Sequence, residues 1–380
     1  MKDFLMGRQR KSKNMISWIA LTFLSFMLFS CSKEKVNEQR KIDKIIGVKI
    51  YDYEISLPGL FEEWRSLGIN AAFVSISLGS NKVFMELAKR NNISTFIIVP
   101  IFYNPEELQK KPDSFAITDS GDNAKEEWVC FVCPSREDYR RQRIEYIKNL
   151  IRQLNPDGIS LDFIRYFVFW EKIYQDRTLN SIANSCFDSH CLDKFQKDTN
   201  IRIPQGVSGV SERAKWIIGN HIQEWTDWKC KIITSMVKDV TEEVKKIKPD
   251  IIINVHAVPW REDDFGGAIK IIAGQDFAEI AQYTDFLSPM CYSHMLKRKP
   301  SWINSVVKDI YSQTNSKIIP SIQVKEAYLK DKLSTSEFRK SLAEALKVPS
   351  KGVVFWSWEA LEKDPEKKGE IKALIQAMKR

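Results

Sequence analysis

Residues 157–166 read Asp157-Gly158-Ile159-Ser160-Leu161-Asp162-Phe163-Ile164-Arg165-Tyr166. An apolar run of this length, preceded by the turn signal Asp157-Gly158, predicts a buried strand. Asp162 ends that run, and a carboxylate at this place is costly to bury unless it is hydrogen-bonded, ion-paired or used in chemistry. Asp162, with Arg165 and Tyr166 after it, is therefore the first candidate for a functional site, and a structural Asp–Arg pair is the alternative.

Seven more apolar runs flank this one and alternate with helix-like stretches. Near-continuous apolar strands separated by helices indicate a parallel sheet, and eight such units over about 335 residues predict a (β/α)8 TIM barrel at 45–380, with an insertion after strand 4 at 167–215. A doubly wound open sheet is the rival, but Tyr51-Asp52-Tyr53-Glu54 lacks the glycine-rich turn of a dinucleotide site. The other predicted strands are 45–51, 70–77, 94–102, 251–258, 285–292, 317–324 and 352–358.

Helices are predicted between these strands. Ser334 and Glu337 have the spacing of a capping box. The predicted helices are 60–67, 81–90, 135–154, one long helix at 215–248, 277–283, 301–313, 334–346 and a charged helix that closes the chain.

The composition of the 380-residue chain is that of a globular protein, with 43% hydrophobic and 28% charged residues. The net charge is +9, of which residues 1–30 contribute +4 through five Lys/Arg and one Asp. No basic tract interleaved with aromatic residues is present in the predicted barrel, which argues against a nucleic-acid partner.

Residues 1–30 are typical of a targeting segment. A basic stretch is followed by an apolar run, 15–29, that is short for a transmembrane helix. The run ends Leu28-Phe29-Ser30-Cys31, which resembles a bacterial lipobox, so we expect a signal peptide at 1–30, lipidation of Cys31 and a tether at 31–44. An uncleaved N-terminal anchor is the alternative. Both place the barrel outside the cytoplasm, in the cell envelope at the outer membrane or cell surface.

Six cysteines follow Cys31, and disulfides are permitted outside the cytoplasm. The pairs Cys130/Cys133 and Cys186/Cys191 are compatible with local disulfides, buried thiols or a shared zinc ion, for which His190 is a further ligand. We expect no cofactor and no metal.

The ends of the predicted strands give the floor of a barrel pocket. No Ser-His-Asp set with a nucleophile elbow and no phosphate loop is present. Carboxylates together with aromatic rings in a barrel mouth are typical of glycoside hydrolysis, where one carboxylic acid protonates the leaving oxygen and another carboxylate acts on the opposite face of the sugar. The strand-end residues are Asp52, Phe102, Tyr103, Asp162, Arg165, Tyr166, Asn254, His256, Trp260, Met290, Tyr292, His294, Gln323, Glu326, Trp356, Trp358 and Glu359.

The sequence resembles the bacterial glycosyl-hydrolase-like, family-10-like TIM-barrel lipoproteins over roughly residues 45–365. Residues 157–166 look like the "DGIHLDYIRYP" motif of that group, and 285–296, 320–324 and 352–358 look like its last three strands. Residues 186–195 are similar to a "CxxxxCxxxF" element that follows strand 4 in several sugar-cleaving barrels, sometimes with bound metal. The resemblance implies that Asp162 is the principal functional acid, and it leaves the partner acid open.

Our leading hypothesis is a surface-anchored glycoside hydrolase with Asp162 and Glu326 as its catalytic carboxylates. Simpler roles are a helix cap for Asp52, a solvated loop acid for Glu326 and a first-turn helix acid for Glu359. A non-catalytic glycan-binding barrel and a metal-dependent hydrolase using His256, His294 and Asp162 are the rival functions. The expected substrate-binding residues are Asp52, Arg165, Tyr166, His256, Tyr292, His294, Trp356, Trp358 and Glu359.

Overall fold

The structure, a computed structural model, describes residues 44–52 and 57–377. The predicted signal peptide, the lipidation site Cys31 and all but the last residue of the tether lie outside the described residues. No described helix is both long and apolar enough to cross a membrane.

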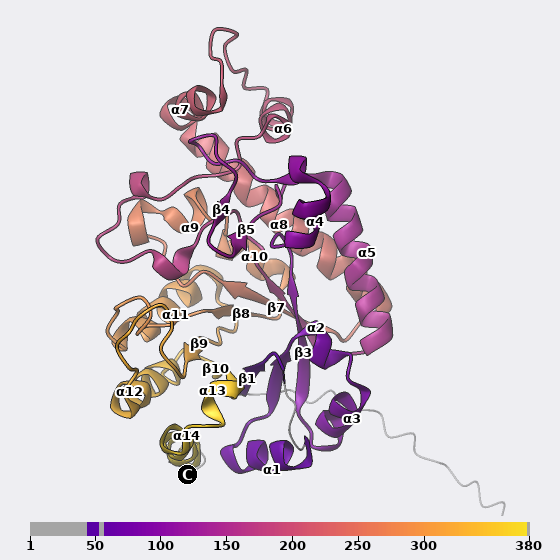
Figure 1. Cartoon of the computed structure of the whole chain (residues 1–380), viewed down its shortest axis with the longest axis vertical. Coiled ribbons are helices and arrows are strands. Elements are labelled where there is room, and N and C mark those ends of the chain that lie inside the picture. Colours follow the sequence, from indigo (N-terminus) through magenta and orange to yellow (C-terminus); the bar gives the residue numbers. More distant parts are fainter. Residues whose placement is uncertain (1–43, 53–56, 378–380) are drawn as a thin grey trace, which may run out of the picture. The chain divides into compact units, whose positions relative to one another are not determined.

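Eight parallel strands form the predicted (β/α)8 barrel (Figure 1). Their order in the sheet is β8-β7-β6-β3-β2-β1-β10-β9. Parallel bridges from Leu287 to Ile318 and from Met290 to Ser321 connect the two ends of this order, so the ring is nearly closed. The strands are β1 (Ile45–Ile50), β2 (Ala71–Val74), β3 (Ser94–Pro100), β6 (Gly158–Asp162), β7 (Ile252–Ala257), β8 (Phe286–Pro289), β9 (Ser321–Gln323) and β10 (Gly352–Trp356).

Helices connect successive strands and cover the outside of the sheet. Side chains satisfy free backbone N–H groups at several helix starts, as Asn81 does for Phe84 N and Ser334 for Glu337 N. The helices are α1 (Leu57–Leu67), α2 (Ile76–Gly79), α3 (Lys82–Arg90), α4 (Pro105–Lys110), α5 (Glu137–Leu154), α6 (Ser189–Thr199), α7 (Val210–Asn220), α8 (Ile222–Ile247), α9 (Ala268–Ile271), α10 (Phe277–Ile280), α11 (Ser301–Thr314), α12 (Thr335–Ala345), α13 (Trp358–Leu361) and α14 (Pro365–Ala377).

Two helix predictions need correction. The long helix predicted at 215–248 is two helices, α7 and α8, which meet at His221, where the backbone leaves the helical region (φ −141°, ψ 34°). The Ser334–Glu337 capping box forms only in part, because Ser334 accepts from Glu337 N while the Glu337 carboxylate contacts His294 instead.

The insertion after the fourth barrel strand, β6, is confirmed, and it runs through two 3-10 turns and α6 before α7 begins. We call this insertion, residues 163–209, the β6 excursion. A second long connection, the β3 excursion, runs over residues 101–136 between β3 and α5 and includes the short antiparallel pair β4 (Lys125–Glu126) and β5 (Val129–Cys130). Figure 1 shows α6 and α7 together at one end of α8, away from the barrel strands. These two excursions stand next to each other, since the Thr118–Ser185 bridge joins them.

The barrel interior has an apolar lower layer. Its residues come from alternate strand positions and form a cluster separate from the larger core between sheet and helices. Phe73 and Phe96 stack at 4.8 Å in this layer. Gly47 and Gly158 leave room for them, because a Cβ at either glycine would lie 2.8 or 2.5 Å from the nearest ring atom. The layer comprises Ile45, Ala71, Phe73, Phe96, Ile98, Phe286, Ile319 and Val354.

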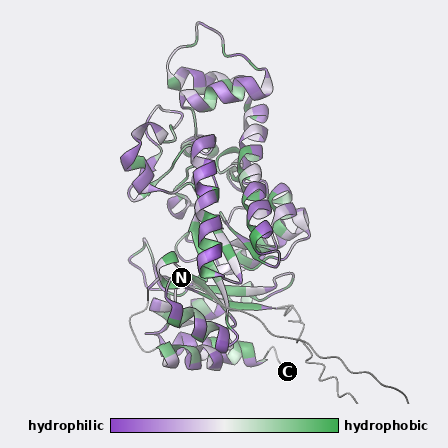
Figure 2. Ribbon diagram, turned by 90° about the vertical axis from the view of Figure 1, so that its right-hand side faces the viewer, coloured by the Kyte–Doolittle hydropathy of each residue, from purple (hydrophilic) through white to green (hydrophobic). Residues whose placement is uncertain are grey.

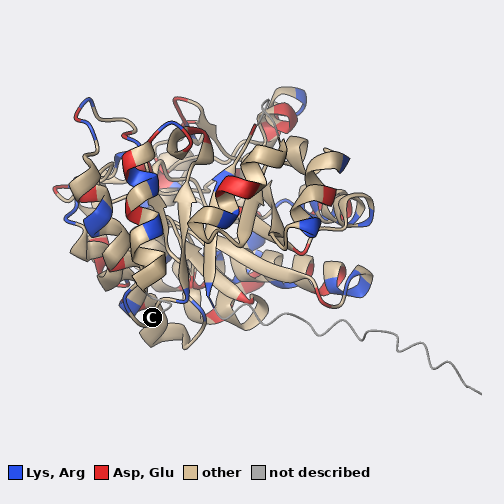
Figure 3. Ribbon diagram, turned by 90° about the horizontal axis from the view of Figure 1, so that it is seen from below, with Lys and Arg blue, Asp and Glu red and all other residues tan. Residues whose placement is uncertain are grey.

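The same alternation places polar side chains in the layer above, toward the C-terminal strand ends. Charged residues are otherwise concentrated on helices and loops, and the strands are largely free of them (Figure 3), while apolar residues dominate the strands (Figure 2). The inward-facing positions of three strands nevertheless carry ionisable residues: Lys49 in β1, Asp162 in β6 and His256 in β7. Polar residues placed inside an otherwise apolar barrel indicate where the function of this fold resides.

Candidate active site

A cavity of about 370 Å³ opens at the C-terminal ends of the barrel strands. It is the place at which TIM barrels carry their active sites. Its walls combine acidic, basic and aromatic side chains. They are Lys49, Tyr51, Ile98, Pro100, Tyr103, Trp128, Asp162, Phe163, Arg165, Trp170, Glu171, Met290, Tyr292, Tyr328 and Trp356.

Asp162 ends β6 and presents its carboxylate to the cavity, with 16% of the side chain exposed. The Phe163 N–H donates to Oδ1 of Asp162 at 2.8 Å. Phe163 itself lies in the left-handed region, with φ of 50°. A bulky residue rarely adopts this conformation, and such strain is concentrated at functional sites. The backbone turn thus fixes the direction of the Asp162 carboxylate.

A buried polar chain supports Asp162 from below. Asn254 Nδ2 donates to Ser160 Oγ, and Ser160 Oγ lies 3.2 Å from Nε2 of His256. Because Ser160 already accepts a hydrogen bond from Asn254, its own proton is available for Nε2, which leaves the His256 proton on Nδ1. Nδ1 faces Oδ2 of Asp162 at 3.4 Å, an electrostatic contact, and it has no hydrogen-bond partner among the described residues.

The charges around Asp162 favour its ionised form. Burial alone raises the pKa of this carboxyl, but His256, Lys49 and the Phe163 N–H outweigh it and hold the pKa below the usual 3.8. Burial and the charge on Lys49 lower the pKa of His256 below 6.5, against the opposing effect of Asp162. The imidazole is therefore neutral near pH 7, and Lys49 supplies the positive charge.

Lys49 is a buried cation in β1, only 1% exposed. Its Nζ donates to the hydroxyl of Tyr292 at 3.3 Å. Burial lowers the pKa of Lys49 to about 8, although Asp162 opposes this shift. Lys49 therefore remains mostly charged at neutral pH and balances Asp162 inside the barrel.

Glu171 is the second carboxylate of the cavity wall, and the sequence analysis did not identify it. It lies in the 3-10 turn Trp170–Lys172 of the β6 excursion. Oε2 of Glu171 is buried and makes no hydrogen bond with the described residues. Burial raises the pKa of Glu171 to about 7, although the nearby Arg165 opposes the shift. Glu171 therefore carries a proton for a large part of the time at neutral pH.

Arg165 lines the cavity but does not form the predicted alternative, a structural pair with Asp162. Its guanidinium donates to the carbonyls of Tyr166 and Val168, at 3.3 and 2.8 Å. It also lies over the rings of Phe131 and Phe163. Arg165 thus holds the start of the β6 excursion and places a positive charge near both carboxylates.

Aromatic rings form much of the cavity wall. Tyr292 and Trp356 stack at 4.5 Å with an interplanar angle of 19°. At the rim, Trp128 Nε1 donates to the Tyr328 hydroxyl at 2.9 Å, and both side chains are more than 40% exposed. Exposed and half-buried rings of this kind offer flat apolar faces with polar edges, which suit the faces of sugar rings.

The structure brings four of the residues predicted for catalysis or substrate binding into the cavity wall, namely Asp162, Arg165, Tyr292 and Trp356. Two further predicted strand-end residues, Tyr103 and Met290, also line it. His256 lies beneath Asp162 and is fully buried, so it supports the site from inside the barrel.

The other predicted carboxylates lie elsewhere. Oε2 of Glu326 accepts from Leu333 N at 3.4 Å in the loop after β9, and Glu326 is not among the residues that line the cavity. Oε1 of Glu359 accepts from the backbone N–H groups of Tyr51 and Asp52, at 2.6 and 3.2 Å. Neither Glu359 nor Asp52 lines the cavity.

Three more predicted residues do not line the cavity. His294 contacts the Glu337 carboxylate at 3.1 Å. Trp358 is fully buried and packs edge-on against Trp64, because the chain enters α13 there and the strand alternation ends. Tyr166 is also fully buried, with Lys229 Nζ 4.5 Å from its ring.

The residues that the sequence analysis missed had weak local signals. Lys49 is a single cation within the apolar strand β1. Glu171 follows the aromatic run Phe167-Val168-Phe169-Trp170, in which an acid is unexpected. Trp128 lies in the β3 excursion, directly before the short strand β5 and far from the end of any barrel strand.

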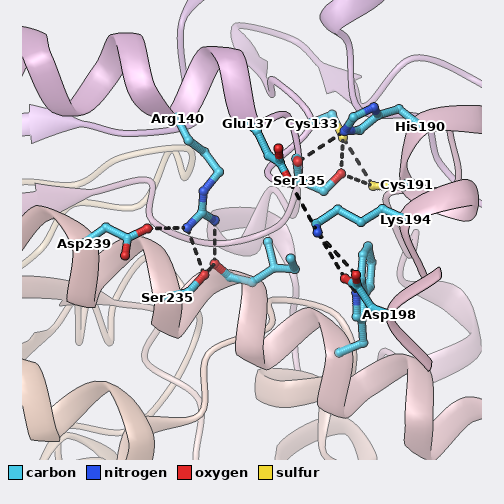
Figure 4. A network of polar contacts seen from close by, with 12 residues as sticks. Cys133, Ser135, Glu137, Arg140, His190, Cys191, Lys194, Asp198, Ser235 and Asp239 are labelled. Atoms are coloured by element: carbon cyan, nitrogen blue, oxygen red, sulfur yellow. Dashed lines mark hydrogen bonds and ion pairs between the residues drawn. The ribbon is translucent and has the colours of Figure 1, made fainter. Parts of the chain in front are cut away.

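Potential metal ligands gather at one place in the part of the chain that the structure describes. These are Cys133, Cys186, Asp188 and Cys191, whose ligand atoms lie within 4.8 Å of one another. Cys130 is not a member of this cluster, and His190 contacts the Ser135 carbonyl instead (Figure 4). His256, His294 and Asp162 form no such group, so the geometry does not support the metal-dependent hydrolase.

Comparison with known proteins shows which solved structures share this fold. No family model and no curated protein matches the sequence. Among solved structures, the PgaB (BpsB) glycoside hydrolase domain of Bordetella bronchiseptica is similar with a TM-score of 0.65 and 14% identity, covering 87% of this chain and 98% of that one. The β-galactosidase of the psychrophilic Marinomonas ef1 has a TM-score of 0.64 and 10% identity, covering 88% of this chain. A catalytic mutant of the GH42 β-galactosidase Gan42B of G. stearothermophilus has a TM-score of 0.61 and 12% identity, covering 89% of this chain. This chain spans 59% and 57% of those two proteins, and the similarities establish that it has the TIM-barrel fold of known glycoside hydrolases.

Proposed function

We propose that the protein is a glycoside hydrolase that cleaves a poly- or oligosaccharide with Asp162 and Glu171 as its two carboxylates. The observation that carries the proposal is the contrast between these two acids in one cavity. The surroundings keep Asp162 ionised, whereas burial raises the pKa of Glu171 to about 7. When two neighbouring acids have pKa values that differ in this way, the one with the higher pKa can donate a proton and the other can act as a carboxylate. Here these would be Glu171 and Asp162.

In this mechanism Glu171 donates its proton to the glycosidic oxygen as the bond to the leaving sugar breaks. Asp162 acts from the opposite side of the sugar ring, either attacking the anomeric carbon or removing a proton from the attacking water. His256 and Lys49 stabilise the charge on Asp162. Glu171 thus takes the place that we predicted for Glu326, which lies outside the cavity wall.

The substrate class is supported by two further observations. Tyr292 and Trp356 form a stacked aromatic pair in the wall, and Trp128 and Tyr328 form an exposed aromatic edge. The structurally similar proteins are a glycoside hydrolase domain and β-galactosidases, which act on carbohydrates. We therefore propose a carbohydrate ligand for this cavity.

We further propose that the chain is a lipoprotein, with Cys31 as the lipidated residue and the barrel held at the cell envelope. The support is the sequence alone: a basic stretch, an apolar run at 15–29 and Ser30-Cys31. Mass spectrometry of the protein purified from membranes tests this. A diacylated N-terminal Cys31 is expected, and an intact N-terminus at Met1 would contradict it.

The decisive experiment combines two variants with two kinds of substrate. A panel of glycans identifies the substrate, and a 2,4-dinitrophenyl glycoside of the same sugar provides a leaving group that needs no protonation. Glu171→Gln is expected to lose about 10²–10⁴-fold on the glycan but little on the dinitrophenyl glycoside, whereas Asp162→Asn loses a comparable factor on both.

Glu326→Gln is the matched control, with nearly unchanged rates on both substrates. Equal losses on both substrates for Glu171→Gln would refute its role as the acid. Saturable glycan binding without turnover in the unmodified protein would favour the rival function, a glycan-binding barrel.

A further inference from the structure

A second hollow, of about 370 Å³, lies at the start of α11 and shares no lining residue with the active-site cavity. Four cations line this basic hollow, namely Arg261, Lys297, Arg298 and Lys299, and none of its described lining residues is acidic. We propose that the basic hollow binds a carboxylate, sulfate or phosphate group on the glycan, so that the substrate is an acidic polysaccharide. This inference rests on the proposed glycoside hydrolase function and names its substrate class.

Arg298 is a half-buried cation without an anionic partner. Its guanidinium lies 5.9 and 5.7 Å from the ring centroids of Phe265 and Trp302, and it forms no ion pair or side-chain hydrogen bond with the described residues. Burial and the charge on Arg261 lower the pKa of Arg298 below the usual 12.5, although Asp264 opposes the shift. A guanidinium binds oxyanions through paired N–H donors, so a carboxylate, sulfate or phosphate would satisfy Arg298.

The surroundings of Arg298 add to the positive charge. The exposed side chain of Lys299 forms no ion pair with the described residues, whereas Arg261 is paired with Asp264 at 2.7 Å. The first turn of α11 contains no acidic residue, so the positive end of the helix dipole is not offset there. Like charges that gather around a hollow repel one another, and a bound anion would relieve this repulsion.

The basic hollow lies close to the active-site cavity along the chain of the β6 excursion. Glu171 lines the cavity, and Gln175 lines the basic hollow four residues later. Four residues span at most about 14 Å even when fully extended. A glycan that is cleaved beside Glu171 can therefore reach the basic hollow with a sugar further along the same chain.

The segment after β8 makes the same connection and packs against the β6 excursion at both places. At the cavity, the ring centroids of Trp170 and Tyr292 lie 5.8 Å apart. At the basic hollow, Gln175 Nε2 donates to the carbonyl of Lys297 at 3.1 Å. Because the same two segments form walls of both sites, the anion is more simply a part of the substrate than a lipid headgroup.

The test measures the binding of acidic oligosaccharides to the full-length protein by isothermal titration calorimetry. The probes are oligosaccharides of polygalacturonate, alginate and chondroitin sulfate, each with a neutral counterpart in which the carboxyl groups are reduced to alcohols and the sulfates are removed. We expect at least one acidic probe to bind about tenfold or more tightly than its neutral counterpart. This preference should weaken as NaCl is raised, because salt screens charges at an open site.

Two kinds of variant assign the preference to the basic hollow. Lys299→Glu should weaken binding of the acidic probe at least about tenfold, and Arg298→Lys, which keeps the charge but loses the paired donors, should weaken it less. Lys82→Glu makes the same charge change as Lys299→Glu at an exposed lysine of α3 and should bind as the unmodified protein does. Lys299 is exposed, so Tm of its variant should stay within about 3 °C of that of the unmodified protein.

Equal affinity for every acidic probe and its neutral counterpart, or equal losses in Lys299→Glu and Lys82→Glu, would overturn the proposal. If a glycan is nevertheless hydrolysed, the glycoside hydrolase function stands without this site. Lys299-dependent binding of an acidic probe without hydrolysis of any glycan would instead support the site and remove the hydrolase function. Binding to phosphatidylglycerol vesicles but to no acidic probe would assign the basic hollow to a lipid headgroup and overturn the proposal.

Discussion

Nδ1 of His256 lies 3.4 Å from Oδ2 of Asp162, across the boundary between the paired strands β7 and β6. The contact couples the Asp162 carboxylate to a chain of buried polar groups that ends at Asn254. The charge of Asp162 is therefore controlled from within the barrel.

Removing His256 should change the acid side of the pH profile. His256→Gln takes away one of the groups that lower the pKa of Asp162, so that pKa rises, while Lys49 and the Phe163 N–H still oppose the effect of burial. We expect the acid limb of kcat/KM to move up by about one pH unit, equivalent to about 1.4 kcal/mol. His294→Gln, a change outside the cavity wall, should leave the acid limb of kcat/KM where it is in the unmodified protein. An acid limb at the same pH in the unmodified protein, His256→Gln and His294→Gln would contradict the coupling between His256 and Asp162.

The alkaline side of the profile should belong to Glu171. The protonated form is the active one, so kcat/KM of the unmodified protein falls as the pH rises through about 7, the pKa of this group. In Glu171→Gln the residual activity should show no limb near pH 7, as measured from pH 5 to 9. A limb that persists in this variant would assign it to another group.

Glu171 should also make stability depend on pH. Its pKa rises from 4.5 in the unfolded chain to about 7 in the folded protein, so the folded state holds the proton longer and stability falls as the pH rises from 4.5 to 7. Glu171→Gln removes this loss. Urea unfolding measures the difference in unfolding free energy between Glu171→Gln and the unmodified protein at two pH values. This difference should be up to about 3 kcal/mol more favourable to the variant at pH 8 than at pH 4. An equal difference at both pH values would exclude the effect.

Trp356 and Trp358 should respond differently to truncation. Trp356 is half-buried in the cavity wall, whereas Trp358 is fully buried against Trp64. Trp356→Ala is expected to weaken sugar binding about tenfold with a small change in stability, since one aromatic contact contributes about 0.5–1.5 kcal/mol. Trp358→Ala should cost about 3–5 kcal/mol of unfolding free energy. Calorimetric titration and urea unfolding of both variants measure the contrast, and similar stability losses would contradict it.

The fold and the position of Asp162 in the cavity wall were predictable because they follow from local periodicity. Buried parallel strands are continuous apolar runs, and the residue that ends such a run lies at the active face of a barrel. Asp162, Tyr292 and Trp356 were found in this way. Glu171 was missed because its position depends on the path of an irregular excursion, which no periodic pattern encodes.

Errors at other strand ends have a similar cause. β9 ends at Gln323, so Glu326 lies in the following loop, and the strand rule no longer applies to it. Trp358 begins α13, so the alternation that would pair it with Trp356 stops at Ser357. The rule that strand-end residues face the cavity works well for the last residue of a strand. It predicts side-chain positions less accurately for each residue of loop or helix that follows.

β8 and β9 are the most weakly paired neighbouring strands of the barrel. Isolated bridges, at Leu287 with Ile318 and at Met290 with Ser321, take the place of the continuous ladders seen between the other neighbours. A shorter ladder opens at lower cost, so a local opening of the barrel would begin there. Since Tyr292 follows β8 and stacks on Trp356 of β10, that opening would separate an aromatic pair and let the mouth of the barrel widen on one side.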